Sequence, residues 1–202
     1  MMPGSPATRG GTHPTAASTG VWVGVATISM SFAAYTSAMI VRQGASGDWL
    51  HFRLPSVLYL NTLVIVASGV TLEVARRNHA NRSMEGDGVL ALPGPVSRTR
   101  NWITATLILG LLFLVGQVVA WRQLGAQGLF LATNPSSAFF YILTALHGIH
   151  LLGGLGGLLY ARRRLRRGPA LDAGPVLGAA ALYWHFMAVL WLYVLLLLVV
   201  RL

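Results

Sequence analysis

Five nearly continuous apolar runs divide this chain of 202 residues. They lie at about 21–41, 54–75, 102–121, 137–161 and 176–200. Each is close to the ~20 residues that a helix needs to cross ~30 Å of hydrocarbon. Since hydrocarbon offers no partner to backbone polar groups, runs of this length fold as helices. The sequence therefore predicts an all-α, polytopic membrane protein built as a five-helix transmembrane bundle.

The composition agrees with a membrane location, because 54% of the residues are hydrophobic and only 10% are charged. The net charge of +10 does not indicate a nucleic-acid partner. The arginines lie at the ends of the apolar runs, where lipid headgroups and topology explain them. With no cysteine in the chain, a metal or haem could be held only by His, Met or carboxylate side chains.

The distribution of arginine predicts how the bundle is oriented. Residues 1–19 are expected to form a flexible tail ahead of a transmembrane domain at 20–202, with a loop at 86–95 and the second helix starting at Leu54-Pro55. Ten arginines fall in two of the links: Arg76, Arg77, Arg82, Arg98, Arg100, Arg162, Arg163, Arg164, Arg166 and Arg167. Because cytoplasmic links carry the excess of positive charge, the N-terminus is predicted inside and the C-terminus outside.

Three histidines lie inside the last two apolar runs, at His147, His150 and His185. An unpaired polar group in hydrocarbon costs several kcal/mol by rough estimate, so each imidazole needs a partner. His147 and His150 share one helix face. At 1.5 Å per residue, His150 and His185 lie about 15–18 Å from the cytoplasmic end of their helices, so they could face each other.

Three interpretations fit these histidines. His150 and His185 could be the axial ligands of a b-type haem. The imidazoles could also form a proton or ion pathway with Glu73 and the intramembrane hydroxyls. The third interpretation, which the residues alone favour, is that each histidine bonds to a neighbouring helix and ties the bundle together. Trp184 and Trp191 lie deep enough to indicate helix packing or contact with a lipid chain.

Blocks in all five helices carry a resemblance, at 20–32, 61–71, 110–121, 139–154 and 183–191. In these blocks the chain resembles subunit III of the haem-copper oxidases, in the short five-helix form of bacteria. The resemblance implies a subunit with no active site of its own and no bound haem or copper, which belong to the partner subunits I and II. It implies phospholipid in a cleft between helices one and two and helices three to five. It also implies a place in the bacterial cytoplasmic (inner) membrane, with a periplasmic C-terminus.

On this resemblance, the subunit supports assembly, lipid binding and stable proton-coupled reduction of O₂ by subunit I of a cytochrome c oxidase. The structural and interface candidates are His147, His150, His185, Tyr183, Trp184, Trp191, Gln117 and Glu73. The lipid-cleft candidates are Trp22, Phe32, Phe139, Phe140, Gly153 and Gly154. No catalytic, cofactor-binding or metal-binding residue is expected, since family members keep similar histidines without a cofactor.

The chain departs from the family at three positions that usually hold an acidic residue. They are occupied by Ile28, Ala120 and Ala188. Since losing an acid together with its partner can be nearly neutral, we expect that a buried polar network was removed as a set. A direct proton-relay role is then not expected. The alternatives are a subunit III-like protein of a nitric oxide reductase or quinol oxidase complex, or an independent b-type haem electron carrier.

Overall fold

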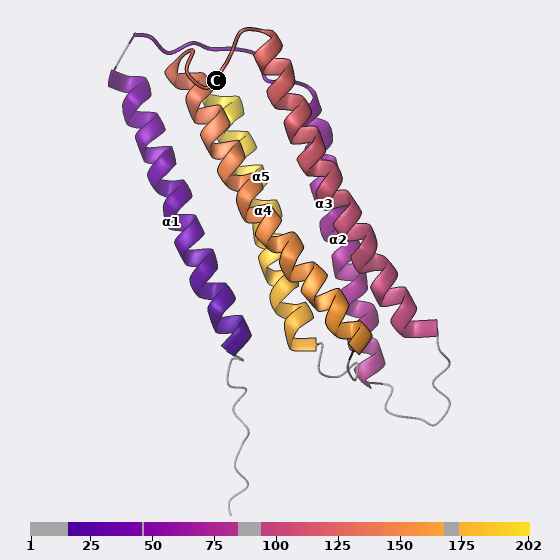
Figure 1. Ribbon diagram of the computed structural model, residues 1–202. Helices are drawn as coiled ribbons and strands as arrows, with labels where there is room; N and C mark the ends of the chain where they lie inside the picture. Colours follow the sequence, from indigo (N-terminus) through magenta and orange to yellow (C-terminus); the bar gives the residue numbers. More distant parts are fainter. Residues whose placement is uncertain (1–15, 46, 85–93, 168–173) are drawn as a thin grey trace, which may run out of the picture.

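The structure is a computed structural model that describes residues 16–45, 47–84, 94–167 and 174–202. These residues form five α-helices and no strand. The helices are α1 (Ala16–Ala45), α2 (Val57–Met84), α3 (Gly94–Ala126), α4 (Pro135–Arg167) and α5 (Gly174–Arg201). All five are long and apolar enough to cross a membrane, which confirms the predicted all-α bundle. Figure 1 shows them running side by side along the length of the molecule.

The helices are longer than the apolar runs that predicted them. α3 and α4 contain 33 residues each, which is about 50 Å of helix against ~30 Å of hydrocarbon. α1 begins at Ala16, so residues 16–19 of the expected tail are helical, and the rest of that tail lies outside the described residues. Most of the expected loop at 86–95 also lies outside them, while Gly94 and Pro95 open α3.

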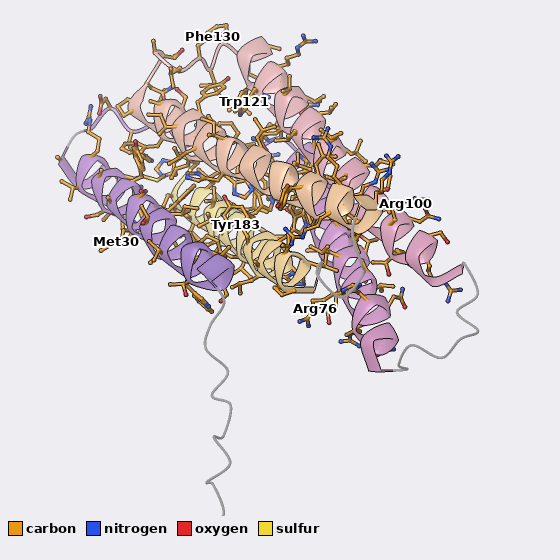
Figure 2. The ribbon with its side chains drawn as sticks, turned by 60° about the horizontal axis from the view of Figure 1, so that its bottom comes forward. Met30, Arg76, Arg100, Trp121, Phe130 and Tyr183 are labelled. Atoms are coloured by element: carbon orange, nitrogen blue, oxygen red, sulfur yellow. The ribbon has the colours of Figure 1, made fainter. Side chains whose placement is uncertain are left out.

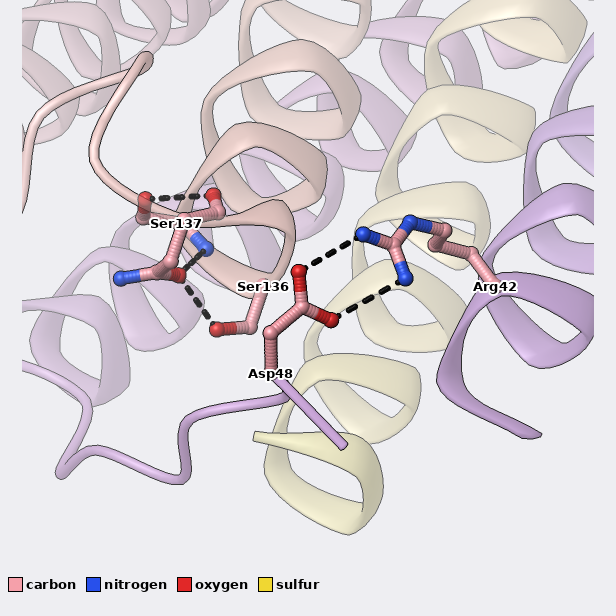
Figure 3. A network of polar contacts seen from close by, with 5 residues as sticks. Arg42, Asp48, Ser136 and Ser137 are labelled. Carbon is pink, nitrogen blue, oxygen red and sulfur yellow. Dashed lines mark hydrogen bonds and ion pairs between the residues drawn. The ribbon is translucent and has the colours of Figure 1, made fainter. Parts of the chain in front are cut away.

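Polar side chains fix two helix ends on the same side of the bundle (Figure 3). α4 starts directly after Asn134, whose Oδ1 accepts hydrogen bonds from the Ser137 amide at 2.8 Å and the Ser136 hydroxyl at 2.5 Å. Asn134 is thus a helix N-cap, and the proline that follows it suits the first helical position. Near the end of α1, Arg42 makes a two-pronged ion pair with Asp48, at 2.8 and 3.1 Å.

The link between α1 and α2 packs over the C-terminal end of α5. The Trp49 indole donates to the Arg201 carbonyl at 2.9 Å, and the Phe52 amide donates to the Leu202 carbonyl at 3.0 Å. Pro55 lies just ahead of α2 rather than in its first turn, and its carbonyl accepts a hydrogen bond from the amide three residues on at 3.1 Å. The carbonyls of Arg201 and Leu202, at the end of α5, have no partner within the helix and are satisfied by Trp49 and Phe52.

α5 lies at the centre of the helix contacts, since it packs against α1, α2 and α4. α2 has its most extensive contact with α3, whereas α1 stands at one edge against α5 and α4 (Figure 1). The resemblance implies that helices one and two form one group and helices three to five another. The contacts instead join α2 to α3, and α1 to α5 and α4. Polar pairs such as Thr71 and Thr106, whose hydroxyls are 2.8 Å apart, join α2 to α3 instead. A lipid cleft stays a prediction.

Glycines such as Gly116 and Gly154 allow close contact between helices. At Gly116 of α3, an added Cβ would collide with the side chain of Asn61 on α2. At Gly154 of α4, an added Cβ would lie 3.1 Å from a ring atom of Tyr183 and 3.2 Å from one of Trp184, both on α5. Membrane helices approach one another through small residues of this kind.

We expect Gly116→Ala to destabilise the bundle by about 1–3 kcal/mol, as overpacking does. The new methyl would displace the Asn61 amide, which donates to the Phe113 carbonyl at 3.2 Å. Gly156→Ala is the matched control, since nothing lies within 4 Å of its added Cβ and alanine is the better helix residue by roughly 0.5–1 kcal/mol. In thermal unfolding of the full chain in detergent, the first variant should lose stability and the second should not. Equal shifts would contradict the tight α2–α3 contact.

Candidate functional site

His147 lies on α4 in the centre of the bundle, with no exposed surface. Its ring centroid is 5.7 Å from that of Phe113 on α3 and 5.2 Å from that of Trp191 on α5. The Phe113 and Trp191 rings meet edge-on at 4.8 Å. Neither ring nitrogen of His147 has a hydrogen-bond partner among the described residues. The imidazole therefore acts here as a packed ring within an aromatic cluster from three helices.

His150 and His185 hydrogen-bond to their own helices. The Nδ1 atom of His150 donates to the Leu146 carbonyl at 2.7 Å, and that of His185 donates to the Ala181 carbonyl at 2.8 Å. A carbonyl can only accept, so Nδ1 carries the hydrogen in both rings. We expected the histidines to join α4 to α5, but each of these two bonds stays within one helix. Instead the Tyr183 hydroxyl donates to the backbone carbonyl of His150 at 3.0 Å.

Two tryptophans of α5 make hydrogen bonds to α2 that the sequence analysis did not identify. The Trp184 indole donates to the Ser68 hydroxyl at 3.0 Å, and the Trp191 indole donates to the Thr62 hydroxyl, also at 3.0 Å. Both indoles are fully buried. The two tryptophans are seven residues, or two helical turns, apart and so share one face of α5, but no comparable spacing marks their hydroxyl partners on α2.

Gln117 lies on α3 one turn from Phe113 and one turn from Trp121. Phe113 contacts His147, and the Trp121 indole donates to the Thr144 hydroxyl at 3.0 Å. Gln117 is therefore level with the stretch of α4 between Thr144 and His147. It is only 3% exposed, and neither Oε1 nor Nε2 has a hydrogen-bond partner among the described residues. A buried polar group in this condition costs about 1–3 kcal/mol.

Glu73 lies in the second half of α2 and forms ion pairs with two arginines of the same helix. Its carboxylate accepts from Arg76 and Arg77, each at 2.9 Å. The Thr62 level, where Trp191 and the aromatic cluster lie, is eleven residues away along α2, or roughly 16 Å. The interpretation of a proton or ion pathway from the imidazoles to Glu73, one of the three that the sequence left open, stays untested by this geometry.

The six lipid-cleft candidates have different surroundings. Three are covered by neighbouring helices: Phe32, Phe140 and Gly154. The other three are exposed or half-buried: Trp22, Phe139 and Gly153. Trp22, at 59% exposed, has the largest surface free for lipid among the aromatic candidates. Their exposure alone does not define a common groove, and the lipid cleft stays a prediction.

The three positions at which the resemblance implies acidic residues lie inside or beside the apolar core. Ile28 is 7% exposed and Ala120 is 0% exposed, and both belong to the core cluster. Ala188 is partly buried and packs against that cluster. Gln117 lies one turn before Ala120 on α3, so an unpartnered polar group remains near one of the missing acids.

Across the ranges that the structure describes, no group of three or more His, Asp or Glu side chains comes together as a potential metal site. The buried His147 packs against rings, the half-buried His150 and His185 bond to their own backbone, and the buried tryptophans bond to hydroxyls on another helix. The five apolar helices and the hydrogen bonds between them define a multi-pass helical membrane protein.

The chain belongs to the cytochrome c oxidase subunit III family. The model of that family matches residues 7–200, which covers all five helices. The predicted resemblance is thus confirmed, and the chain is a subunit III of a haem-copper oxidase.

Several curated relatives agree with this membership. A probable cytochrome c oxidase subunit 3 of Mycobacterium leprae is 31% identical over 175 residues, covering 80% of this chain and 74% of the relative. The protein of the same name from Mycobacterium tuberculosis is 29% identical over 168 residues, with the same coverage. The cytochrome c oxidase subunit 3 of Thermostichus vulcanus is 27% identical over 188 residues, covering 89% of this chain and 85% of the relative.

Proposed function

We propose that this chain is the non-catalytic partner of subunits I and II in a respiratory terminal oxidase. It would support their assembly and the sustained, proton-coupled reduction of O₂ by subunit I. The observation that carries the proposal is how the three imidazoles of α4 and α5 are held. His147 is enclosed by Phe113 and Trp191, while His150 and His185 bond to their own backbone. Haem and copper are therefore expected in the partner subunits and not on this chain.

Affinity purification of the tagged full chain from its native membranes, in mild detergent, tests this assignment. Mass spectrometry should find a haem-copper subunit I and a subunit II in amounts comparable with the chain. A tagged, unrelated multi-pass protein from the same membranes is the control for detergent carry-over. Recovery of the chain alone, or with an unrelated transporter, would overturn the proposal.

We propose cytochrome c as the electron donor of the complex, which the names of the relatives support. The purified complex should consume O₂ when supplied with reduced cytochrome c. Consumption of O₂ with quinol alone would indicate a quinol oxidase, and turnover of nitric oxide without O₂ consumption would indicate a nitric oxide reductase.

The arginines support a cytoplasmic N-terminus and a periplasmic C-terminus in the bacterial inner membrane. Figure 2 shows Arg76 of α2 and Arg100 of α3 at one end of the bundle, with Trp121 and Phe130 toward the other. Arg162 of α4 also lies at the end that holds Arg100, because both line one pocket. The end with the larger positive charge should face the cytoplasm.

The chain has no cysteine, so single cysteines can report this orientation directly. Gly47→Cys, in the exposed link after α1, should react with a membrane-impermeant maleimide in intact spheroplasts. Ala80→Cys, exposed at the arginine-rich end of α2, should react only after the membrane is permeabilised. The reverse pattern would overturn the proposed orientation.

A further inference from the structure

A pocket of about 550 Å³ lies between α3 and α4 at the arginine-rich end of the bundle. Its lining includes three arginines, one from α3 and two from α4, together with an amide, a hydroxyl and an apolar side chain: Arg100, Arg162, Arg166, Asn101, Thr104 and Ile108. None of the structural, interface or lipid-cleft candidates lies in it. The pocket is therefore separate from the aromatic and histidine core.

The charges of this pocket favour an anion. Three guanidinium groups share it, and no described carboxylate lines it. Arg162 is partly buried, and its Nε donates to the Thr104 hydroxyl at 3.0 Å, which holds the guanidinium against the pocket wall. Guanidinium groups bind phosphate oxygens through paired, charge-assisted hydrogen bonds. A bound phosphate would also relieve the repulsion between the three like charges.

The shape of the lining favours a lipid over a free phosphate. From Arg100 to Ile108 the lining of α3 passes from charged to apolar, over about 12 Å of helix. Ile108 is 60% exposed, and an exposed apolar stripe continues from it on the same helix face at Leu111, Leu112 and Val115. Such a surface fits an acyl chain that runs into the membrane from a headgroup held at the arginines.

We propose that the α3–α4 pocket binds the phosphate headgroup of an anionic phospholipid, with an acyl chain along the Ile108 stripe of α3. Basic pockets between transmembrane helices on the cytoplasmic side recognise such headgroups. The inference deepens the lipid-binding part of the proposed function by giving it a site. It does not depend on which oxidase subunits accompany the chain, so its failure would leave that assignment standing.

Phosphatidylglycerol is the probe. The full chain is reconstituted in nanodiscs of phosphatidylcholine with a minority of phosphatidylglycerol, and the lipid that it retains after release is measured by native mass spectrometry. The chain should retain phosphatidylglycerol in preference to phosphatidylcholine. An excess of inorganic phosphate should not displace it, because phosphate lacks the acyl chain. Displacement by phosphate, or equal retention of both lipids, would overturn the lipid assignment.

Matched triple variants separate the pocket from the general surface charge. Arg100→Gln/Arg162→Gln/Arg166→Gln should reduce retained phosphatidylglycerol by about fivefold per arginine. The control, Arg98→Gln/Arg163→Gln/Arg164→Gln, removes the same charge at exposed positions outside the pocket and should retain the lipid. Lysine at the three pocket positions keeps the charge but loses the paired hydrogen bonds, so this triple should retain an amount of lipid between those of the glutamine triple and the unchanged chain. Equal losses in the two glutamine triples would contradict the proposal.

Discussion

Replacing Trp191 with alanine is expected to lower the free energy of unfolding by about 3–5 kcal/mol, the range for large buried aromatics. The Trp191 ring is 0% exposed and packs edge-on against Phe113 at 4.8 Å. Its indole also donates to the Thr62 hydroxyl. Alanine would leave a cavity where α2, α3, α4 and α5 meet. Denaturant unfolding of the full chain in detergent measures the effect.

Two further variants separate packing from hydrogen bonding at this position. Trp191→Phe keeps a ring but removes the bond to Thr62, so it should lose about 1 kcal/mol through that bond and a further amount through lost volume. Trp22→Ala is the exposed control, since Trp22 is 59% exposed, and should change stability little. If Trp191→Ala were no more harmful than Trp22→Ala, the aromatic cluster would not be a stabilising core.

Replacing Gln117 with leucine is expected to stabilise the isolated chain by about 1–3 kcal/mol. Gln117 is 3% exposed, and its amide has no hydrogen-bond partner among the described residues. Leucine has a similar size and no polar atom to leave unpaired. Gln123→Leu on the exposed side of α3 is the matched control and should have little effect. The same unfolding measurement applies to both.

A loss of stability in Gln117→Leu would contradict this account, because it would show that the amide has a partner in the folded chain. His147 offers a useful contrast. Its nitrogens are equally unpartnered, but its ring contacts Phe113 and Trp191. A leucine at His147 would lose these ring contacts as it removes the unpaired nitrogens, so the two effects should largely cancel.

The number and nature of the helices could be predicted from the sequence, because hydrocarbon admits few alternatives to an apolar helix. Their ends could not be predicted as well. α3 extends beyond its apolar run at both ends, from Gly94 to Ala126. Hydropathy marks the part of a helix that is buried in lipid, whereas caps such as Asn134 mark where it begins.

The order of the helices in space was not predictable in the same way. Each helix is apolar on most sides, so the sequence does not mark which face meets which neighbour. The contact of α2 with α3 depends on local pairs, including Gly116 with Asn61 and Thr71 with Thr106. Such pairs become visible only when two helices are placed side by side.

Among the structural candidates, the side-chain bonds between helices come from the tryptophans and Tyr183 rather than from the imidazoles. A histidine in a helix can satisfy its Nδ1 hydrogen at the carbonyl one turn earlier, as His150 and His185 do. An indole hydrogen lies too far from its own backbone to do this readily, so Trp184 and Trp191 reach across to Ser68 and Thr62. The depth of an ionisable side chain in the membrane therefore does not by itself predict a bond to a neighbouring helix.

The haem content of this chain, after it is separated from the purified complex, tests the central claim most directly. That claim is that His147, His150 and His185 are structural groups in a subunit with no redox centre. Visible spectroscopy should show the Soret band entirely with the partner subunits and none with this chain. A Soret band that stays with this chain, and is lost when His150 or His185 is replaced by leucine, would contradict the account.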